Sequence, residues 1–110
     1  MADLTDIVLL YATFPNLEAA SASARRIVAE EKAACINMWP GMRSVYRWQG
    51  AVEEAEEVVF VVKTTRARSC EVRDLILETH PYDEPALVEI PVSGGSDSYL
   101  DWIRDSTRAG

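Results

Sequence analysis

Residues 57–64 read Glu57-Val58-Val59-Phe60-Val61-Val62-Lys63-Thr64, an apolar stretch rich in β-branched side chains. Such a run is typical of a strand that is packed on both faces. In the segment before it, residues 43–49, successive side chains form two alternating sets, one for each face of a strand. This pattern predicts a second strand. The turn signal around Gly50-Ala51 lies between the two segments. Residues 43–64 therefore predict a β-hairpin.

Upstream of this hairpin, residues 7–13 form another β-leaning apolar run, which Pro15-Asn16 ends. Asn16 is a suitable N-cap for the segment that follows, in which apolar residues recur at helical spacing. The spacing predicts an amphipathic helix from Leu17 to near Lys32. Residues 33–39 then predict a strand, and Pro40-Gly41 predicts a bend or turn after it.

Downstream of the hairpin, apolar positions at helical spacing predict a second helix, which ends at His80-Pro81 because proline disfavours helical geometry in the residue before it. Residues 86–92 predict a last strand, and Pro91 indicates a sheet edge or a strand end. A short terminal helix follows, with Ser98 and Asp101 as a possible capping box.

The expected order is thus β-α-β-β-α-β plus a final helix. It predicts an α+β, ferredoxin-like fold in which an antiparallel sheet carries two helices on one face. The other face stays uncovered although the strands are apolar on both sides, and the hairpin carries Tyr46 and Trp48. A partner subunit is the expected cover for this face and for the sheet edges.

The length and composition of the chain limit the functions that it can have. The 110 residues predict one domain, residues 1–110, with flexible ends at 1–5 and 106–110. Eighteen acidic against eleven basic residues give a net charge of -7, which argues against nucleic acid and anionic membranes as partners. The N-terminus has no basic region of a signal peptide, and two cysteines make no disulfide framework, so we expect an intracellular protein.

Five motifs, taken in order, resemble one family. They are Ala33-Ala34-Cys35-Ile36-Asn37, Ser44-Val45-Tyr46-Arg47-Trp48-Gln49-Gly50, Lys63-Thr64, His80-Pro81-Tyr82-Asp83-Glu84-Pro85 and Tyr99-Leu100-Asp101-Trp102-Ile103. In this order and spacing the chain resembles the CutA family, the divalent-cation tolerance proteins, from about Ile7 to Ile103.

The resemblance implies a ferredoxin-like protomer in a compact homotrimer, located in the cytoplasm and binding divalent metal ions, copper especially. It implies no enzymatic reaction and no organic cofactor. The family also resembles the PII signalling proteins in its trimeric architecture. A trimeric small-molecule sensor or scaffold with ligand clefts between subunits is therefore the alternative function, by fold analogy alone.

One motif departs from the family pattern. The family commonly reads His-Pro-Tyr-Glu-x-Pro-Glu at the end of the second helix, whereas this chain has Asp83 for the first Glu and Ala86 for the second. Asp83 keeps a carboxylate and Ala86 removes one. A site that relies on the second acid would need Glu84 or Glu89 from another direction.

Cys35, His80 and Asp83 are the candidate metal ligands. Thiolates bind Cu(I) and other soft ions, but a cysteine between Ala34 and Ile36 also packs well as a small apolar side chain. His80, the only histidine, could bind metal or transfer protons, or could be favoured at the helix C-terminus by the helix dipole. Cys70 lies outside the motifs and is expected to be a partly exposed thiol.

The remaining motif residues predict an inter-subunit cleft and an interface. Lys63 with His80, Tyr82 and Asp83 could line a polar cleft that holds an anionic small molecule, although a lysine at a strand end is usually only solvated. Large amphipathic side chains are typical of interface cores, and this chain places three in its motifs: Tyr46, Trp48 and Trp102.

Two further interpretations concern catalysis and the acidic residues of the hairpin. A hydrolase or thiol enzyme that uses Cys35 and His80 would need a glycine-rich oxyanion loop and a third orienting group, and the sequence shows neither. The acidic cluster Glu53-Glu54-Glu56-Glu57 near the hairpin turn is expected to be a solvated face, with at most weak attraction for cations.

Overall fold

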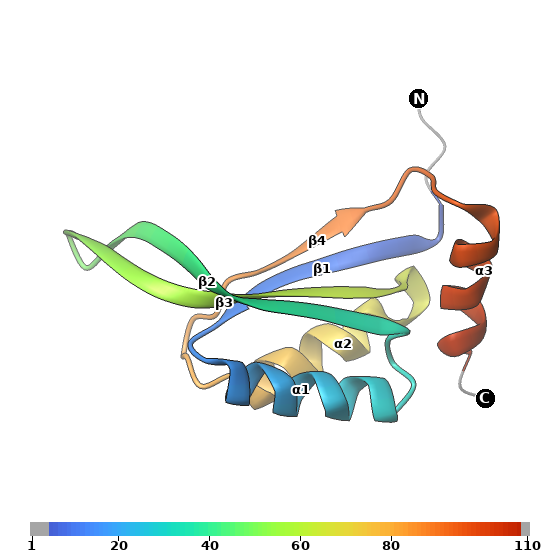
Figure 1. Cartoon of the computed structure of the whole chain (residues 1–110), viewed down its shortest axis with the longest axis horizontal. Coiled ribbons are helices and arrows are strands. Elements are labelled where there is room, and N and C mark those ends of the chain that lie inside the picture. The colour runs from blue at the N-terminus through green and yellow to red at the C-terminus, as the bar shows by residue number, and fades with distance from the viewer. Residues whose placement is uncertain (1–4, 109–110) are drawn as a thin grey trace.

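A computed structural model describes residues 5–108. The elements are, in chain order, β1 (Ile7–Phe14), α1 (Leu17–Ala29), β2 (Cys35–Trp48), β3 (Ala51–Thr65), α2 (Arg66–Thr79), β4 (Leu87–Pro91) and α3 (Asp97–Ser106) (Figure 1). This is the order expected from the sequence.

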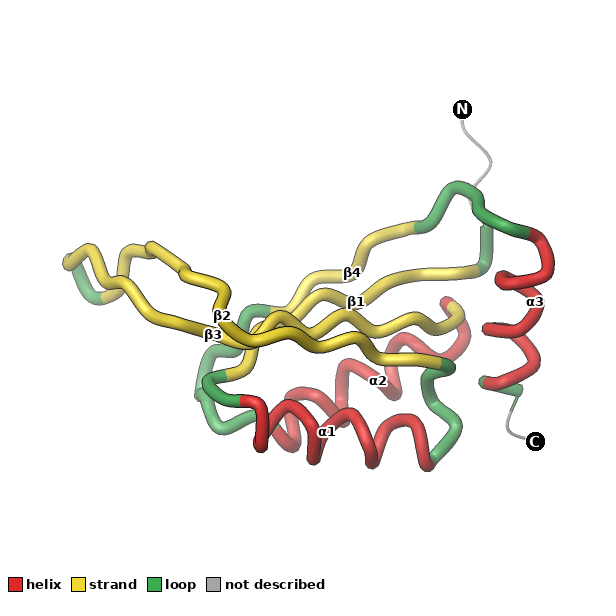
Figure 2. Tube along the Cα trace, viewed as in Figure 1, coloured by secondary structure: helices red, strands yellow, loops and turns green. Residues whose placement is uncertain are grey.

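The four strands form one antiparallel sheet in the order β2-β3-β1-β4. Helices α1 and α2 lie side by side against one face, and α3 lies across one end of the sheet (Figure 2). The α+β, ferredoxin-like expectation is therefore confirmed, with the final helix as an addition. β4 is an edge strand that ends at Pro91, as the proline indicated.

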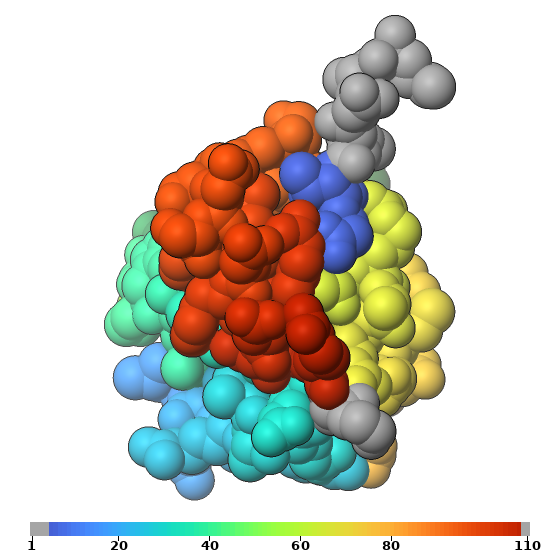
Figure 3. All heavy atoms as spheres, turned by 90° about the vertical axis from the view of Figure 1, so that its right-hand side faces the viewer, coloured from blue at the N-terminus to red at the C-terminus, as the bar shows by residue number. Residues whose placement is uncertain are grey.

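The core lies between the sheet and the two long helices. Its strand residues are the even-numbered ones of β1 and β3, such as Leu10, Phe14 and Phe60, which meet α1 residues such as Ile27 and α2 residues such as Ile76. A smaller apolar cluster joins α3 to the start of β1 through Ile7, Leu100 and Ile103. Figure 3 shows α3 spread over that end of the molecule.

Because side chains alternate along a strand, the odd-numbered residues of β1 and β3 point away from α1 and α2. We call this surface the open face. It carries the strand residues Leu9, Tyr11, Val61, Lys63, Cys35, Asn37, Trp39, Val88 and Ile90. Trp39, Val88 and Ile90 expose 43–55% of their surface there. The open face is thus largely apolar and is not covered by α1 or α2.

Strand β2 is longer than the sequence indicated. Pro40-Gly41 does not end the strand; pairing with β3 shifts register between Trp39 and Met42 and then continues to Trp48. Gly41 has a φ of +89°, a conformation that L side chains rarely adopt. A β-bulge of this kind bends a strand without ending it, which explains the difference.

Beyond the bulge, residues 42–57 form a two-stranded arm, because β1 reaches only to Phe14, opposite Val58 (Figure 1). The arm closes through the two-residue turn Gln49-Gly50, which has positive φ at both residues and so matches the tight hairpin expected there. Val45 and Val52 near its tip are 68% and 70% exposed. An isolated two-stranded ribbon is marginally stable in water.

The helix N-termini confirm one expectation and correct another. The Asn16 side chain accepts a hydrogen bond from the Ala19 amide at 2.8 Å, which confirms it as the N-cap of α1. The expected capping box at Ser98 and Asp101 is wrong, because α3 begins at Asp97 and its N-cap is Ser96. A serine suits an N-cap at either position, but only Ser98 has an acid three residues later, so the capping-box pattern favoured the wrong start.

The expected flexible ends fall partly on residues 1–4 and 109–110, which lie outside the described residues. Fraying does not extend to residues 106 and 107. Ser106 belongs to α3, and Thr107 is 3% exposed and donates from Oγ1 to the Ile103 carbonyl oxygen at 2.9 Å. Within residues 5–108, no helix is both long and apolar enough to span a bilayer.

Candidate functional site

Cys35 is the first residue of β2 and lies opposite Lys63 of β3 on the open face. It is partly exposed, so its thiol is not sealed in the core between the sheet and the helices. Its position in the strand alternation turns it away from α1 and α2, and both interpretations of Cys35, as a small packing residue and as a metal ligand, stay predictions. Cys70 is exposed on α2, as expected.

Lys63 contacts α3. Its Nζ donates to the Tyr99 hydroxyl at 3.1 Å and lies 5.4 Å from the centroid of that ring. The Tyr99 ring in turn stacks on Trp102, one turn further along the helix, at 5.5 Å between centroids. Lys63 is thus more than a solvated strand end. Sequence reasoning did not single out Tyr99, although its spacing of three residues from Trp102 predicts a contact along a helix.

His80 follows α2 and is 8% exposed. Its Nε2 lies 2.6 Å from the Thr13 carbonyl oxygen, which can only accept, and its Nδ1 accepts the Tyr82 amide hydrogen at 3.1 Å. These two bonds define a neutral ring with the proton on Nε2. The ring also packs 4.3 Å from Phe14 between centroids. His80 therefore ties the end of α2 to β1, rather than binding the last carbonyls of its own helix.

Tyr82 packs against the other side of His80, with ring centroids 5.1 Å apart. Burial raises the pKa of Tyr82, and the nearby Glu57 and Tyr46 raise it further. Glu57 itself is only 8% exposed, so it does not belong to the solvated acidic face expected at residues 53–57. Its position at the base of the arm, opposite Met42, places it beside the sheet instead of at the exposed tip.

The candidate residues fall into two groups that lie apart in one protomer. Cys35 pairs with Lys63 of β3, whereas His80 bonds to Thr13, which pairs with Val59. Four residue steps along β3 separate these two points, about 13 Å. Lys63 therefore does not share a cleft with His80 inside one chain, and residues 5–108 contain no group of three or more His, Cys, Asp or Glu placed to hold a metal ion.

Asp83 is exposed in the loop after His80. Among the other acids weighed from the sequence, Glu84 is exposed as well, while Glu89 lies in β4 and pairs with Arg73 at 3.6 Å. The large aromatic residues expected at an interface are exposed in the protomer: Tyr46 by 44%, Trp48 by 52% and Trp102 by 45%.

Comparison with known proteins places this geometry in a family. The family model "CutA1 divalent ion tolerance protein" matches residues 8–106. Protein CutA of Arabidopsis thaliana, described as chloroplastic, is 40% identical over 101 residues, which are 92% of this chain. The chain spans only 56% of the length of that relative.

Two solved structures show the same fold. CutA from Xylella fastidiosa superposes with a TM-score of 0.91 at 34% identity and covers 94% of this chain and 99% of its own. The protein from Archaeoglobus fulgidus, described as a periplasmic divalent cation tolerance protein, has a TM-score of 0.89 at 36% identity and covers 92% of this chain and 98% of its own. Since these relatives are described as chloroplastic and periplasmic, the cytoplasmic location stays a prediction. The chain belongs to the CutA1 divalent ion tolerance family.

Proposed function

We propose that this chain works in divalent-cation tolerance as a homotrimer that binds a divalent metal ion, copper first, without a catalytic reaction or an organic cofactor. The observation that carries the metal proposal is the partly exposed Cys35 thiol on the open face of a chain from this family. Thiolates are preferred ligands of soft metal ions.

The metal site in this proposal is completed between subunits, because one protomer keeps Cys35 about 13 Å along the sheet from the His80 group. Asp83 offers an exposed carboxylate in the loop after α2. His80 offers Nδ1 only when it releases the Tyr82 amide, so Cys35 is the first ligand to test.

Self-association is supported by two surfaces described above. The open face exposes apolar side chains between two unpaired strand edges, and the arm exposes Tyr46 and Trp48 on a ribbon that has no third strand. Apolar patches of this kind are typical of subunit interfaces. Light scattering on the purified protein is expected to give three times the 12.2 kDa protomer mass; a monomer would contradict the trimer.

Calorimetric titration with copper under anaerobic conditions tests the metal site. The variant Cys35→Ala is expected to lose binding, and Cys70→Ala is the matched control, since it removes an exposed thiol from α2. His80→Ala and Asp83→Ala then test the second group. Binding that survives in Cys35→Ala, or that Cys70→Ala weakens equally, would exclude Cys35 as the first ligand.

A second candidate function is a small-molecule sensor or scaffold with clefts between subunits. The observation that favours it is the fixed group of Lys63, Tyr99 and Trp102, in which an ammonium and two stacked rings stand at the edge of the open face. In a trimer, the His80, Tyr82 and Asp83 group of a neighbouring copy would complete such a cleft. A thermal-shift screen with anionic metabolites and nucleotides decides between the two: stabilisation by metal alone would contradict the sensor.

A further inference from the structure

Glu57 is a buried acid that has no partner in its own chain. It is 8% exposed, and within residues 5–108 no hydrogen bond or ion pair involves its side chain. Its oxygens still reach the protomer surface, because the only fully buried side-chain oxygen without a hydrogen bond in this part of the chain is Oε1 of Glu89. Acids are rarely buried to this extent unless they are paired. A cation that approaches from outside the protomer can therefore supply the missing partner.

The surroundings of Glu57 fit the side chain of a lysine. Met42 lies opposite Glu57 in the arm. Burial raises the pKa of Tyr82, and the charges of Glu57 and Tyr46 raise it further, so these three side chains lie close together. Both tyrosines are partly exposed, Tyr46 by 44% and Tyr82 by 43%. Aromatic rings can pack along the aliphatic stem of a lysine, while its ammonium group meets the carboxylate.

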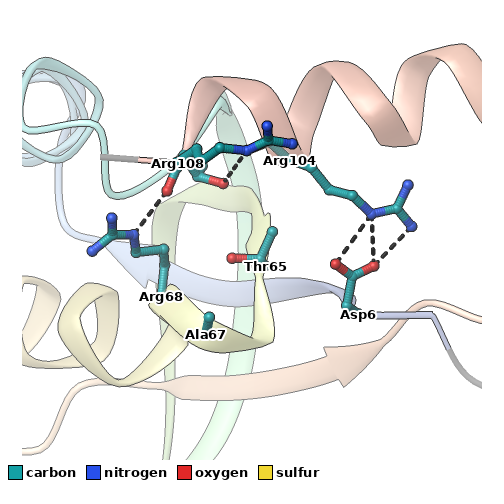
Figure 4. A pocket seen from close by; sticks show the side chains of 7 residues that line it. Asp6, Thr65, Ala67, Arg68, Arg104 and Arg108 are labelled. Carbon is teal, nitrogen blue, oxygen red and sulfur yellow. Dashed lines mark hydrogen bonds and ion pairs between the residues drawn. The ribbon is translucent and has the colours of Figure 1, made fainter. Parts of the chain in front are cut away.

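Most cations of the chain already have an acid of their own. Seven of the eleven lysines and arginines form ion pairs within residues 5–108. Figure 4 shows one of them at the pocket between α2 and α3, where Arg104 binds Asp6. The four cations that form no ion pair with an acid of this part of the chain are Arg25, Arg47, Lys63 and Arg66.

Lys63 is the one of these four that stands on the open face. Its ammonium group has the neutral Tyr99 hydroxyl as its hydrogen-bond acceptor, at 3.1 Å. No other cation lies among the strand residues of the open face, or on the side of the arm that continues this face. That side of the arm carries Met42, Ser44, Tyr46, Trp48, Ala51, Glu53, Ala55 and Glu57. An ammonium group that an interface encloses needs an acid as its partner.

Lys63 and Glu57 lie at opposite ends of the open face. Six residue steps along β3 separate them, about 20 Å, so they cannot meet within one chain. A closed ring of three copies is built from heterologous contacts, in which one patch of each copy meets a different patch of the next. An unpaired cation and an unpaired acid at two different places on the same surface are what such a contact requires.

We propose that Lys63 of each copy pairs with Glu57 of the next copy around the ring. The proposal rests on the homotrimer of the proposed function and adds the contact that selects which surfaces meet. Because both residues have apolar neighbours, a wrong arrangement would enclose one charge without its partner, and this is costly. The pair also neutralises Lys63, so a cleft beside it would attract an anionic small molecule less strongly.

Light scattering through a dilution series, on variants of the full chain, tests the pair. Glu57→Lys and Lys63→Glu each bring like charges together at the contact, and each is expected to raise the dissociation constant of the trimer at least about tenfold. The double variant Glu57→Lys/Lys63→Glu restores opposite charges and is expected to recover the trimer mass. Glu53→Lys is the matched control, because Glu53 lies on the same side of the arm but is exposed, and it should assemble as wild type.

Glu57→Gln and Lys63→Met test the same contact without a reversed charge, and circular dichroism shows whether each variant is folded. Each is expected to raise the dissociation constant, and the two together should raise it by less than the product of the single effects. A trimeric wild type that neither Glu57→Gln nor Lys63→Met weakens, an equal loss in Glu53→Lys, or a double reversal that dissociates more readily than either single reversal would overturn the pair and leave the trimer. A monomeric wild type would overturn both.

Discussion

The hairpin of β2 and β3 passes through two different environments. In the body of the sheet, residues 58–64 of β3 have β1 beside them and α1 and α2 against one face, and Phe60 and Val62 are fully buried. In the arm, the same two strands have only each other, and Val45 and Val52 are mostly exposed. Packing within one chain stabilises the body. The arm lacks such packing, so its stability is expected to depend on contact with a partner subunit.

The largest effect is expected in the body. Phe60 is 0% exposed and its ring centroid lies 4.6 Å from that of Phe14. Phe60→Ala leaves a cavity between the sheet and the helices and should cost about 3–5 kcal/mol of unfolding free energy. Urea denaturation at one protein concentration measures it, with Leu77→Ala on the exposed surface of α2 as the control. A loss in Phe60→Ala no larger than in the control would contradict this account of the core.

A substitution in the arm is expected to weaken assembly of the subunits rather than folding of the single chain. Trp48, next to the turn, is 52% exposed, so its removal leaves no cavity in the protomer core. In the proposed trimer it packs on another copy, and Trp48→Ala should give a lighter particle by light scattering than the wild type, with little change in far-UV circular dichroism. Leu77→Ala, equally exposed at 51%, should keep the wild-type mass. An unchanged particle mass for Trp48→Ala would show that Trp48 does not contribute to assembly.

The turn of the arm is the next test. Gly50 has a φ of +81°, and nothing lies within 4 Å of the position of an added Cβ. Gly50→Ala therefore causes backbone strain without a steric clash and should cost about 1 kcal/mol. Urea denaturation of Gly50→Ala measures this cost. Gly94→Ala, which also meets open space but has no positive φ, should cost less. Equal losses of unfolding free energy in the two variants would show that the positive φ of Gly50 causes no extra strain in Gly50→Ala.

The body was also the easier part to predict. The apolar run at residues 57–64, the Asn16 cap and the helix end at His80 are each determined by local physical chemistry, and the structure confirms all three. The arm shows where local signals fail. Pro40-Gly41 suggested a turn because both residues favour turns, but pairing with β3 on both sides of the bulge overrides that preference.

Which candidate site residues lie close together depends on the register of the paired strands, and a single sequence does not specify that register. Lys63 and His80 were grouped because both end an element and both carry polar side chains. Within one chain, antiparallel pairing places them about 13 Å apart along the sheet and brings Lys63 to Tyr99, so the cleft between subunits stays a prediction. Likewise, the sequence grouped Glu57 with the exposed acids near the turn. The structure places it at the base of the arm, next to the point where β1 ends, and there it is buried.

The smallest effect is expected at the opposite end of the body, where Arg104 of α3 holds Asp6. The hydrogen bonds from Arg104 keep the pKa of the Asp6 carboxyl below its ordinary value of 3.8. A carboxyl with a lowered pKa in the folded state stabilises the fold above its unfolded pKa, and this contribution is lost as the pH falls through the folded pKa. Because the pair is exposed and screened by water, it should contribute only a little to stability.

Asp6→Asn should therefore lose that small amount at neutral pH and show a shallower decline in stability below about pH 4. Urea midpoints measured from about pH 2 to about pH 7 follow both quantities. Glu53→Gln in the arm is the control, because that acid is exposed and has no ion pair among the described residues. The same acid slope in Asp6→Asn and in the wild type would mean that α3 is held at this end by Leu100 and Ile103 packing on Ile7, without a contribution from the ion pair.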